Sequence, residues 1–537
     1  MREVNRRSDS KWLYWSLTWL RWGLITMSKD INRREILKWG AGLAAGLASA
    51  AAGAAQRGSA SSTVDLAIDS KDKLWRLGAA DLAGLIQSKQ VSSQEVLQAF
   101  LGRIGEVNGQ VNAVTQVLEK EAMAAAKQAD MMLAKGKLIG PLHGVPVSVK
   151  ENIDVAGSST SVGVAAFKAN IAPEDSAEVA NLRKAGAIPF ARTNCPDFVV
   201  RWHTHSSAYG QTFSPWSRRH TTGGSSGGEA VALATGMTPL GLGTDLGGSL
   251  RYPAQCCGIS SLKPTLGRVA QSNYFAGPGS ISNQMFGVSG PMARHVRDLR
   301  LAYQTLTQQD RGDPWWTPAP IDYGATQTPV RVALCLKPAN IAAAADVTAG
   351  VKRAADALDA AGYLVEEVQP PMLQEAADLW ASVMTQEIRE YLLATMEEKA
   401  FVDGFAMARN MAKVVPELNY KGYVAAFAAR HEIAQRWSEF AGRYPLILAP
   451  VSTRPPFVIG EDARSEESIN AVLQSMRMVV SMNLLGLPVV TLPTGIAGGL
   501  PQSVQVIGDR FHESLCLQAA EVIENSLGVI TPINPNT

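Results

Sequence analysis

The sequence is poor in the features that mark several specialised classes of protein. Its 5 cysteines among 537 residues are odd in number and scattered, which fits neither a paired disulfide framework nor a CxxC zinc site. We interpret them as small buried apolar groups; they are Cys195, Cys256, Cys257, Cys335 and Cys516. Neither sign of charge dominates, with 50 Lys and Arg against 48 Asp and Glu, and no long basic stripe is present. A dedicated nucleic-acid binder is therefore excluded.

The overall composition is that of a large globular protein. Hydrophobic residues make up 46% of the chain and charged residues 18%. This composition provides enough apolar side chains for a large core and excludes a mainly disordered protein. We find no internal repeat. At about 150 residues per domain the length would give three or four domains, but that figure is only a starting expectation.

The N-terminal segment differs from the rest. Residues 1–26 carry Trp12, Trp15, Trp19 and Trp22 at helical spacing, which alone would suggest an interfacial membrane helix. A second pattern starts at Met27 and spans residues 27–55. It has paired arginines, a weakly apolar Ala/Gly/Leu run, and the small-residue sequence Ala-Gly-Ala near its end. These are the parts of an export signal.

The paired arginines, Arg33 and Arg34, indicate the twin-arginine type of signal, so we predict a periplasmic or secreted protein. The apolar run is too short and too rich in Ala and Gly for a permanent membrane span, and none is expected after signal removal. Residues 1–26 would then be upstream sequence, with Met27 as the true start. The alternative for the segment is a tryptophan-rich anchor helix that is not cleaved. If the segment is not a functional signal, the protein would be cytoplasmic.

Residues 56–70 have the small, polar composition of a linker, and residues 71–530 are predicted to form the catalytic domain. Ser92 and Glu95 form a capping-box pattern ahead of a helix. Short apolar strands bounded by Gly and Pro follow, at 145–149, 187–191 and 239–243, with a helical stretch at 176–185. This alternation predicts an α/β domain with helices on both faces of a sheet.

Three segments carry side chains suited to chemistry. A predicted strand ends at Lys150, the place where such folds build sites. Residues 222–228, Thr-Gly-Gly-Ser-Ser-Gly-Gly, precede a helical stretch, and the glycines allow a close backbone approach. A phosphate-binding P-loop would need a Lys-Ser or Lys-Thr pair there, which is missing. Residues 243–251, Gly-Thr-Asp-Leu-Gly-Gly-Ser-Leu-Arg, are a second glycine-rich strand exit with a single serine.

Together the three segments resemble the amidase signature family. Lys150 lies 75 positions before Ser225, and Ser225 lies 24 before Ser249, which is the spacing of that family. The resemblance extends from the helices near Leu74 to the segment ending at Gly508. It implies a large mixed β-sheet covered by helices on both faces, and hydrolysis of a small-molecule amide without cofactor or metal. Monomer and homodimer both remain open.

Transferred to this sequence, the family's Ser-Ser-Lys triad falls on Ser249, Ser225 and Lys150. Ser249 would be the nucleophile, and Ser225 would relay its proton to Lys150, which must be neutral to act as a base. The family places a cis peptide before the bridging serine, here between Gly224 and Ser225. The resemblance also implies an oxyanion hole of backbone N–H groups from Leu246, Gly247, Gly248 and Ser249. Supporting roles go to Ser226, Asp245 and Arg251, the last two through charge-assisted hydrogen bonds.

Other site types are less well supported. The overlapping Gly-x-Ser-x-Gly sequences around Ser225 match the α/β-hydrolase elbow, but a polar, turn-like run precedes them where that fold needs a strand. The histidines available for such a triad are His295, His431 and His512. His203 and His205 alternate as metal ligands would, yet no carboxylate or cysteine is spaced to complete a site.

The identity of the substrate depends on residues 371–443, which match no motif and are rich in Trp, Met, Phe and Tyr. Most such side chains are core, and we expect some to line an apolar or aryl acyl pocket. An alternative function is that of a glutamyl-tRNA amidotransferase, whose A-type amidase chain supplies ammonia to a partner. The predicted export signal argues against that cytoplasmic role, and the intact triad argues against a silent binding protein.

Overall fold

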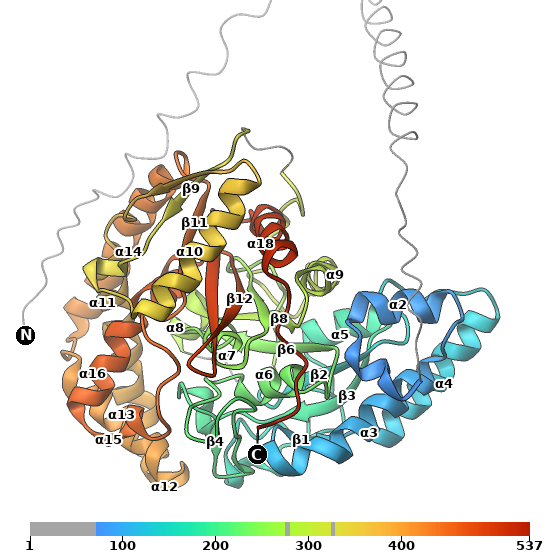
Figure 1. Cartoon of the computed structure of the whole chain (residues 1–537). Coiled ribbons are helices and arrows are strands. Elements are labelled where there is room, and N and C mark those ends of the chain that lie inside the picture. The colour runs from blue at the N-terminus through green and yellow to red at the C-terminus, as the bar shows by residue number, and fades with distance from the viewer. Residues whose placement is uncertain (1–70, 274–279, 324–327, 537) are drawn as a thin grey trace, which may run out of the picture. The chain divides into compact units, whose positions relative to one another are not determined.

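The computed structural model describes residues 71–273, 280–323 and 328–536 (Figure 1). The predicted Trp-rich segment 1–26, export signal 27–55 and linker 56–70 lie outside these residues. Within the described ranges, no helix combines the length and apolarity needed to cross a membrane.

The described residues build an 11-stranded sheet in the order β1-β3-β2-β6-β8-β7-β12-β13-β11-β9-β10. Its strands are β1 (Val114–Val117), β2 (Pro146–Lys150), β3 (Ile188–Thr193), β6 (Leu240–Asp245), β7 (Ser260–Lys263), β8 (Val288–Ala293), β9 (Arg331–Leu334), β10 (Leu364–Glu367), β11 (Leu446–Pro450), β12 (Val489–Ala497) and β13 (Leu500–Gly508). β2 runs parallel to β3 and β6, whereas β6, β8, β7, β12 and β13 pair antiparallel in succession. The sheet is therefore mixed, as expected, and the three strands predicted from sequence are β2, β3 and β6.

Along the sequence, the helices of the described chain precede, separate and follow the strands. They are α2 (Ala79–Gln87), α3 (Ser93–Val111), α4 (Glu119–Ala134), α5 (Ala177–Lys184), α6 (Gly227–Ala234), α7 (Arg251–Cys257), α8 (Ile281–Phe286), α9 (Val296–Leu306), α10 (Ala345–Ala360), α11 (Leu373–Glu387), α12 (Leu393–Lys399), α13 (Val402–Val414), α14 (Tyr420–Ala441), α15 (Glu461–Arg464), α16 (Glu466–Ser475), α17 (Arg477–Leu485) and α18 (Glu513–Leu527). Minor elements are η1 (Lys71–Arg76), η2 (Ala165–Phe167), η3 (Asp197–Val199), η4 (Pro338–Asn340), the π-helical η5 (Ile388–Leu392), and the hairpin of β4 (His205–Ser206) with β5 (Gly210–Gln211).

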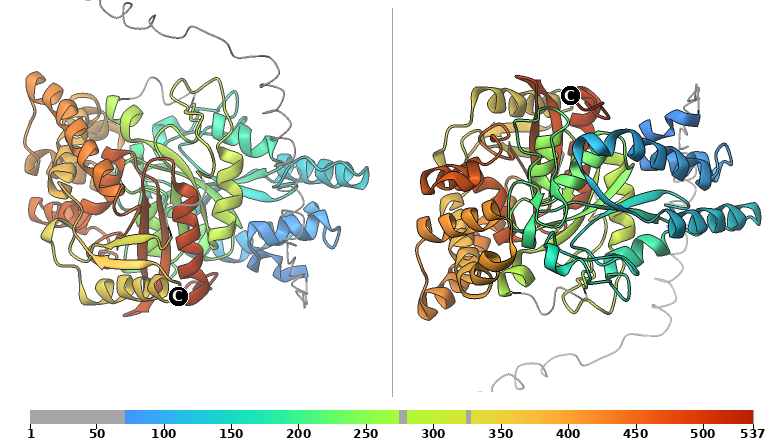
Figure 2. Two further views of the ribbon diagram at one scale, coloured as in Figure 1. Left: turned by 90° about the horizontal axis from the view of Figure 1, so that it is seen from above. Right: turned by 90° about the horizontal axis from the view of Figure 1, so that it is seen from below.

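Helices cover both faces of the sheet. The helix α18 contacts both α9 and α10, and these helices contact strands that include β8, β12 and β13, while α6 and α7 contact each other and the sheet. The orthogonal views show α2, α3 and α4 (blue) at one end of the sheet and the orange helices of residues 371–475 at the other (Figure 2). The buried apolar residues of strands and helices join in one continuous core.

Local sequence signals account for several of these elements. Ser92 caps α3 in the predicted capping box: its Oγ accepts from the Glu95 N–H at 3.1 Å, and the Glu95 carboxylate accepts from the Ser92 N–H at 2.8 Å. The apolar face of α3 is buried as its spacing requires. All five cysteines are free and buried, which confirms their interpretation as core groups.

Candidate active site

Lys150 is the last residue of the central strand β2. The side chain is fully buried, and its Nζ lies 2.7 Å from Ser225 Oγ and 2.9 Å from Thr244 Oγ1. Burial lowers the pKa of Lys150 to about 8, although the nearby acidic groups Asp245 and Glu229 oppose the shift. The neutral amine is thus accessible near neutral pH, as a general base requires.

Ser225 lies in the glycine-rich segment directly before α6. The peptide bond between Gly224 and Ser225 is cis, as the resemblance predicts. A Cβ atom at position 224 would overlap the Arg201 carbonyl oxygen and lie 2.8 Å from the His203 nitrogen. Only glycine lets these backbones approach so closely, and the approach fixes the path of the chain into Ser225.

Ser249 follows the exit of β6, the strand next to β2. Because β2 and β6 are parallel, Lys150 and the loop after Asp245 meet at the same edge of the sheet. Ser249 and Ser225 line one cavity, and the Ser226 N–H donates to the Ser249 carbonyl at 3.3 Å, which joins the two loops. In the described part of the chain, no hydrogen bond links the two hydroxyl groups of Ser225 and Ser249.

The loop from Asp245 to Ser249 has all of its carbonyl groups held by protein donors. The donors are Asn483 Nδ2 to Asp245 (3.1 Å), Trp380 Nε1 to Leu246 (3.0 Å), Trp202 Nε1 to Gly247 (2.8 Å), the Tyr252 N–H to Gly248 (2.8 Å) and the Ser226 N–H to Ser249 (3.3 Å). The C=O and N–H of a trans peptide point in opposite directions. Hydrogen bonds to the carbonyl groups therefore direct the N–H groups of the same peptides away from these donors.

Three N–H groups of this loop remain available. Those of Leu246, Gly247 and Ser249 have no protein acceptor among the described residues. The prediction that Gly248 is also an oxyanion donor is wrong, because the Gly248 N–H donates to Asp245 Oδ1 at 2.7 Å. The Asp245 carboxylate folds back over its own loop and occupies that N–H, so Gly248 cannot also donate to an oxyanion.

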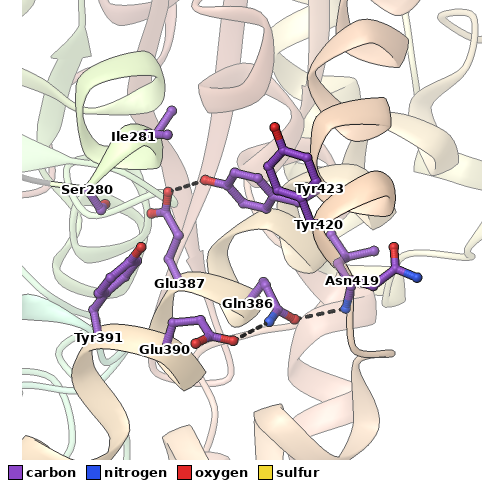
Figure 3. Close-up of a pocket in the computed structure, with 10 residues that line it drawn as sticks. Ser280, Ile281, Gln386, Glu387, Glu390, Tyr391, Asn419, Tyr420 and Tyr423 are labelled. Carbon is purple, nitrogen blue, oxygen red and sulfur yellow. Dashed lines mark hydrogen bonds between the residues drawn. The ribbon is translucent and has the colours of Figure 1, made fainter. Parts of the chain in front are cut away.

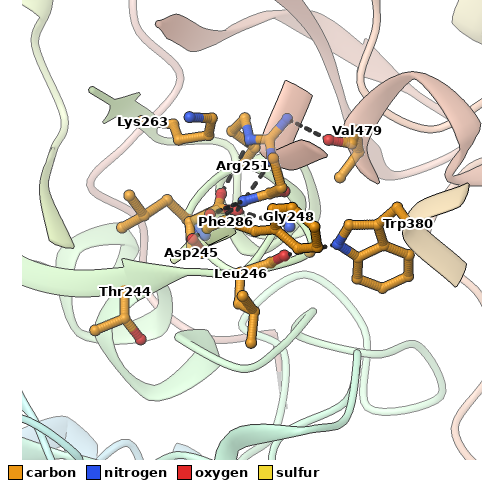
Figure 4. A network of polar contacts seen from close by, with 12 residues as sticks. Thr244, Asp245, Leu246, Gly248, Arg251, Lys263, Phe286, Trp380 and Val479 are labelled. Carbon is orange, nitrogen blue, oxygen red and sulfur yellow. Dashed lines mark hydrogen bonds and ion pairs between the residues drawn. The ribbon is translucent and has the colours of Figure 1, made fainter. Parts of the chain in front are cut away.

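Asp245 and Arg251 form a buried ion pair beside this loop (Figure 4). Arg251 Nε and Nη2 each lie 2.9 Å from a carboxylate oxygen of Asp245, while Nη1 donates to the Val479 carbonyl at 2.8 Å. Burial alone would raise the pKa of Asp245, but the guanidinium of Arg251 holds it well below its ordinary value. Asn483 donates to both the carboxylate and the carbonyl of Asp245 and so connects the loop to α17.

The cavity in front of the two serines has a volume of about 240 Å³. Its apolar wall includes Phe198, Val199, Val200, Trp202, Trp380, Met384, Ile388 and Met411. Amide side chains of Asn152, Gln271, Asn273 and Asn283 also line the cavity. Its charged lining residues are already paired, Asp245 with Arg251, and Arg201 with Asp462 at 2.7 Å. The described lining therefore has no unpaired charged side chain that could bind a charged substrate.

A second cavity, of about 570 Å³, lies between α11 and the start of α14 (Figure 3). It contains none of the predicted site residues. Glu387 on its wall accepts hydrogen bonds from the Tyr423 hydroxyl at 2.6 Å and from the Ser282 N–H at 3.0 Å. These contacts fasten α8 and α14 to α11, the helix that carries Trp380 and Met384 into the first cavity.

The competing site types are not assembled. No strand leads into Ser225, because residues 212–226 contain none, so the α/β-hydrolase elbow is absent. His295, His431 and His512 do not line the cavity of the two serines. The rings of His203 and His205 are 6.5 Å apart, and the described residues contain no group of three potential metal ligands.

Several residues of the site were not predicted from the sequence. Thr244 precedes Asp245 in the strand-exit motif, and its contact with Lys150 could have been suspected from the parallel pairing of their strands. Asn483, Trp202 and Trp380 approach from distant parts of the chain. No local pattern marks them.

Comparison with known proteins agrees with this geometry. A family model described as Amidase matches residues 95–517. An indoleacetamide hydrolase of Bradyrhizobium diazoefficiens is 38% identical over 462 residues, which cover 86% of this chain and 88% of that protein. The A-type chain of a glutamyl-tRNA(Gln) amidotransferase of Salinispora arenicola is 31% identical over 491 residues, 86% of this chain and 99% of that protein.

The fold is shared with solved structures as well. Fatty acid amide hydrolase superimposes with a TM-score of 0.75 at 22% identity, over 86% of each chain, a likeness that concerns the fold alone. The family model covers most of the described chain, including the strand-borne lysine and the two glycine-bounded serines. The chain therefore belongs to the amidase family and is an enzyme that hydrolyses carboxamide C–N bonds.

Proposed function

We propose that this amidase works through a seryl acyl-enzyme built on Ser249, Ser225 and Lys150. The observation that carries the proposal is the contact of the fully buried Lys150 Nζ with Ser225 Oγ at 2.7 Å. A serine hydroxyl is a weak nucleophile and needs a base to take its proton as it attacks. With its pKa lowered to about 8, Lys150 is a suitable base, and Ser225 lies between it and the cavity.

In the proposed reaction Ser249 Oγ bonds to the amide carbonyl carbon, and its proton passes through Ser225 to Lys150. The N–H groups of Leu246, Gly247 and Ser249 donate to the oxyanion of the tetrahedral intermediate. As the C–N bond breaks, the proton returns from Lys150 through Ser225 to the departing nitrogen. Water then attacks the acyl-enzyme by the same route and releases the acid. The relay requires Ser249 Oγ to reach hydrogen-bond distance of Ser225 Oγ during attack.

We propose a neutral amide with a flat, apolar acyl group as substrate. The pocket wall is formed by two tryptophans, a phenylalanine and two methionines, and the charged lining residues Asp245 and Arg201 are paired. A polar or charged acyl group would lose hydration there without an ionic partner. The name of the indoleacetamide hydrolase relative supports an arylacetamide, which would give ammonia and an arylacetic acid.

The test is ammonia release from purified protein with four amides: indole-3-acetamide, phenylacetamide, acetamide and glutamine. We expect kcat/KM for the two arylacetamides to exceed that for acetamide by about 100-fold or more, because burial of an aromatic ring contributes about 3 kcal/mol. Equal rates for acetamide and the arylacetamides would contradict the aryl pocket. Ser249→Ala, which should release no ammonia, controls for a contaminating amidase.

The same assay distinguishes an independent amidase from an amidotransferase chain, which is the second candidate function. The similarity to the amidotransferase chain of Salinispora arenicola makes glutamine the informative substrate. A folded protein that releases no ammonia from any amide alone, yet does so from glutamine once partner chains are added, would be an amidotransferase. The paired charges in the cavity favour the independent amidase, since glutamine would bring two charges into it.

We further propose export through the paired arginines of the N-terminal segment. Replacing both, Arg33→Lys with Arg34→Lys, should keep the charge but remove the twin-arginine pattern. We expect the double variant to accumulate in the cytoplasm as precursor, while the wild-type chain is recovered from the periplasm. Cell fractionation with immunoblotting measures this. An unchanged periplasmic yield would contradict the twin-arginine signal.

A further inference from the structure

The oxyanion loop and the acyl pocket share two tryptophan side chains. Trp380 donates its indole N–H to the Leu246 carbonyl at 3.0 Å, and Trp202 donates to the Gly247 carbonyl at 2.8 Å (Figure 4 for Trp380). Both rings also line the cavity in front of Ser249, with centroids 6.1 Å apart. Each indole thus uses its edge to bind the loop and its apolar surface to build the pocket.

The contact of Trp380 fixes the direction of one N–H group. The Leu246 carbonyl and the Gly247 N–H belong to the same planar peptide and point in opposite directions. Anchoring the carbonyl on Trp380 therefore turns the Gly247 N–H to the opposite side, and that N–H is one of the three without a protein acceptor among the described residues. The ring lies so close that a Cβ on residue 247 would overlap Trp380 Cζ2, so the contact requires glycine.

The contact of Trp202 fixes the next peptide from its carbonyl end. The Gly247 carbonyl accepts from Trp202, and the N–H of the same peptide, on Gly248, donates to Asp245 Oδ1 at 2.7 Å. With both ends held, this peptide cannot rotate. It separates the free N–H groups of Gly247 and Ser249, so its orientation sets the spacing between them.

We propose that Trp380 and Trp202 are positioning residues for the oxyanion hole, acting through the Leu246 and Gly247 carbonyl groups in addition to lining the acyl pocket. This inference rests on the proposed acyl-enzyme mechanism. It assigns the two side chains an effect on the transition state, because the oxyanion develops there and in the tetrahedral intermediate but is absent from the bound amide. A pocket wall, in contrast, acts on the ground state as well.

The main variant is Trp380→Phe, which keeps an aromatic ring and removes the N–H. We expect kcat for an arylacetamide to fall about 10- to 100-fold, the lower part of the range for loss of an oxyanion donor, with a smaller change in KM. The same position carrying 3-benzothienylalanine, in which sulfur replaces the indole N–H in a bicyclic ring of similar shape, should show the same fall. Trp202→Phe should behave likewise.

Two other buried tryptophans provide matched controls. Trp216 donates its indole N–H to the Cys257 carbonyl at 2.8 Å, the same length as the Trp202 bond, but it does not line the cavity. Trp437 is 2% exposed, and its Nε1 has no partner among the described residues. Trp216→Phe and Trp437→Phe should therefore leave kcat within about twofold of the wild type, whatever they do to thermal stability.

Inhibitor binding separates positioning from packing. An arylmethyl trifluoromethyl ketone forms a tetrahedral adduct with a serine and carries an oxyanion, whereas the corresponding methyl ketone binds without one. Trp380→Phe should weaken the trifluoromethyl ketone at least tenfold more than the methyl ketone. Equal weakening of both, or a rise in KM alone, would overturn the positioning role. Failure of the underlying mechanism would look different: Ser249→Ala would keep its turnover, or the wild-type enzyme would form no adduct.

Discussion

Ser249→Ala should abolish amide hydrolysis while leaving the fold intact. Without Oγ no bond to the carbonyl carbon can form, and the remaining oxyanion donors cannot replace a nucleophile. By analogy with other serine-based hydrolases we expect kcat to fall by about 10⁴- to 10⁶-fold. The side chain is 9% exposed at the cavity wall, and its hydroxyl makes no hydrogen bond within the described part of the chain, so its removal should cost little stability.

The measurement is ammonia release from an arylacetamide, combined with intact-protein mass spectrometry after rapid acid quench. The wild-type enzyme should show the mass of the acyl group, located by peptide mapping on the segment that contains Ser249. Ser261→Ala is the matched control, because Ser261 is fully buried in β7 and its hydroxyl has no partner among the described residues. Turnover by Ser249→Ala above about 1% of wild type would remove Ser249 from the nucleophile's role.

The parts of the site that sequence predicted are those encoded by short, glycine-bounded segments. Lys150 ends β2, Ser225 precedes α6, and Ser249 lies between β6 and α7. Parallel pairing of β2 with β6 brings two of these segments to one edge of the sheet. The cis peptide at Gly224 also belongs to such a segment. Local pattern and family spacing were enough here, because the backbone geometry is set within a few residues.

The assignment of oxyanion donors shows where local pattern fails. Four consecutive residues, from Leu246 to Ser249, have equivalent N–H groups in the sequence. One cause that decides which N–H groups are free is the Asp245 carboxylate, which accepts from the Gly248 N–H. The other is the set of donors to the carbonyl groups of the loop, which come from residues as distant as Trp380 and Asn483. The tertiary fold decides these partners, and a composition rich in aromatic residues between 371 and 443 could predict an apolar pocket but not this contact.

Lys150→Met should be nearly as damaging as loss of Ser249. Methionine has a similar volume and fills the buried site, but it removes the amine that takes the proton from Ser225. We expect kcat/KM at pH 7 to fall by about 10⁴-fold for amides. Activated esters should be less affected, because their leaving groups need no proton. Near wild-type amide hydrolysis by Lys150→Met would place the base elsewhere.

The pH dependence tests the same residue. Only the neutral amine can act as the base, and burial lowers the pKa of Lys150 to about 8. About one-tenth of the enzyme is then competent at pH 7, against less than one-thousandth for a lysine of ordinary pKa. We expect kcat/KM to rise with pH and level off above about 8, so activity is lost as pH falls through that value.

Lys263→Met separates Lys150 from the other groups that titrate in this range. Lys263 is also fully buried, and burial lowers its pKa to about 7, but its Nζ donates to the Pro264 carbonyl at 3.0 Å and does not reach the cavity. Burial likewise raises the pKa of Glu229 to about 7. If Lys150 is the base, Lys263→Met keeps the limb near pH 8. Disappearance of that limb in Lys263→Met would mean that the titration belongs to Lys263 and not to Lys150, which would contradict our mechanism.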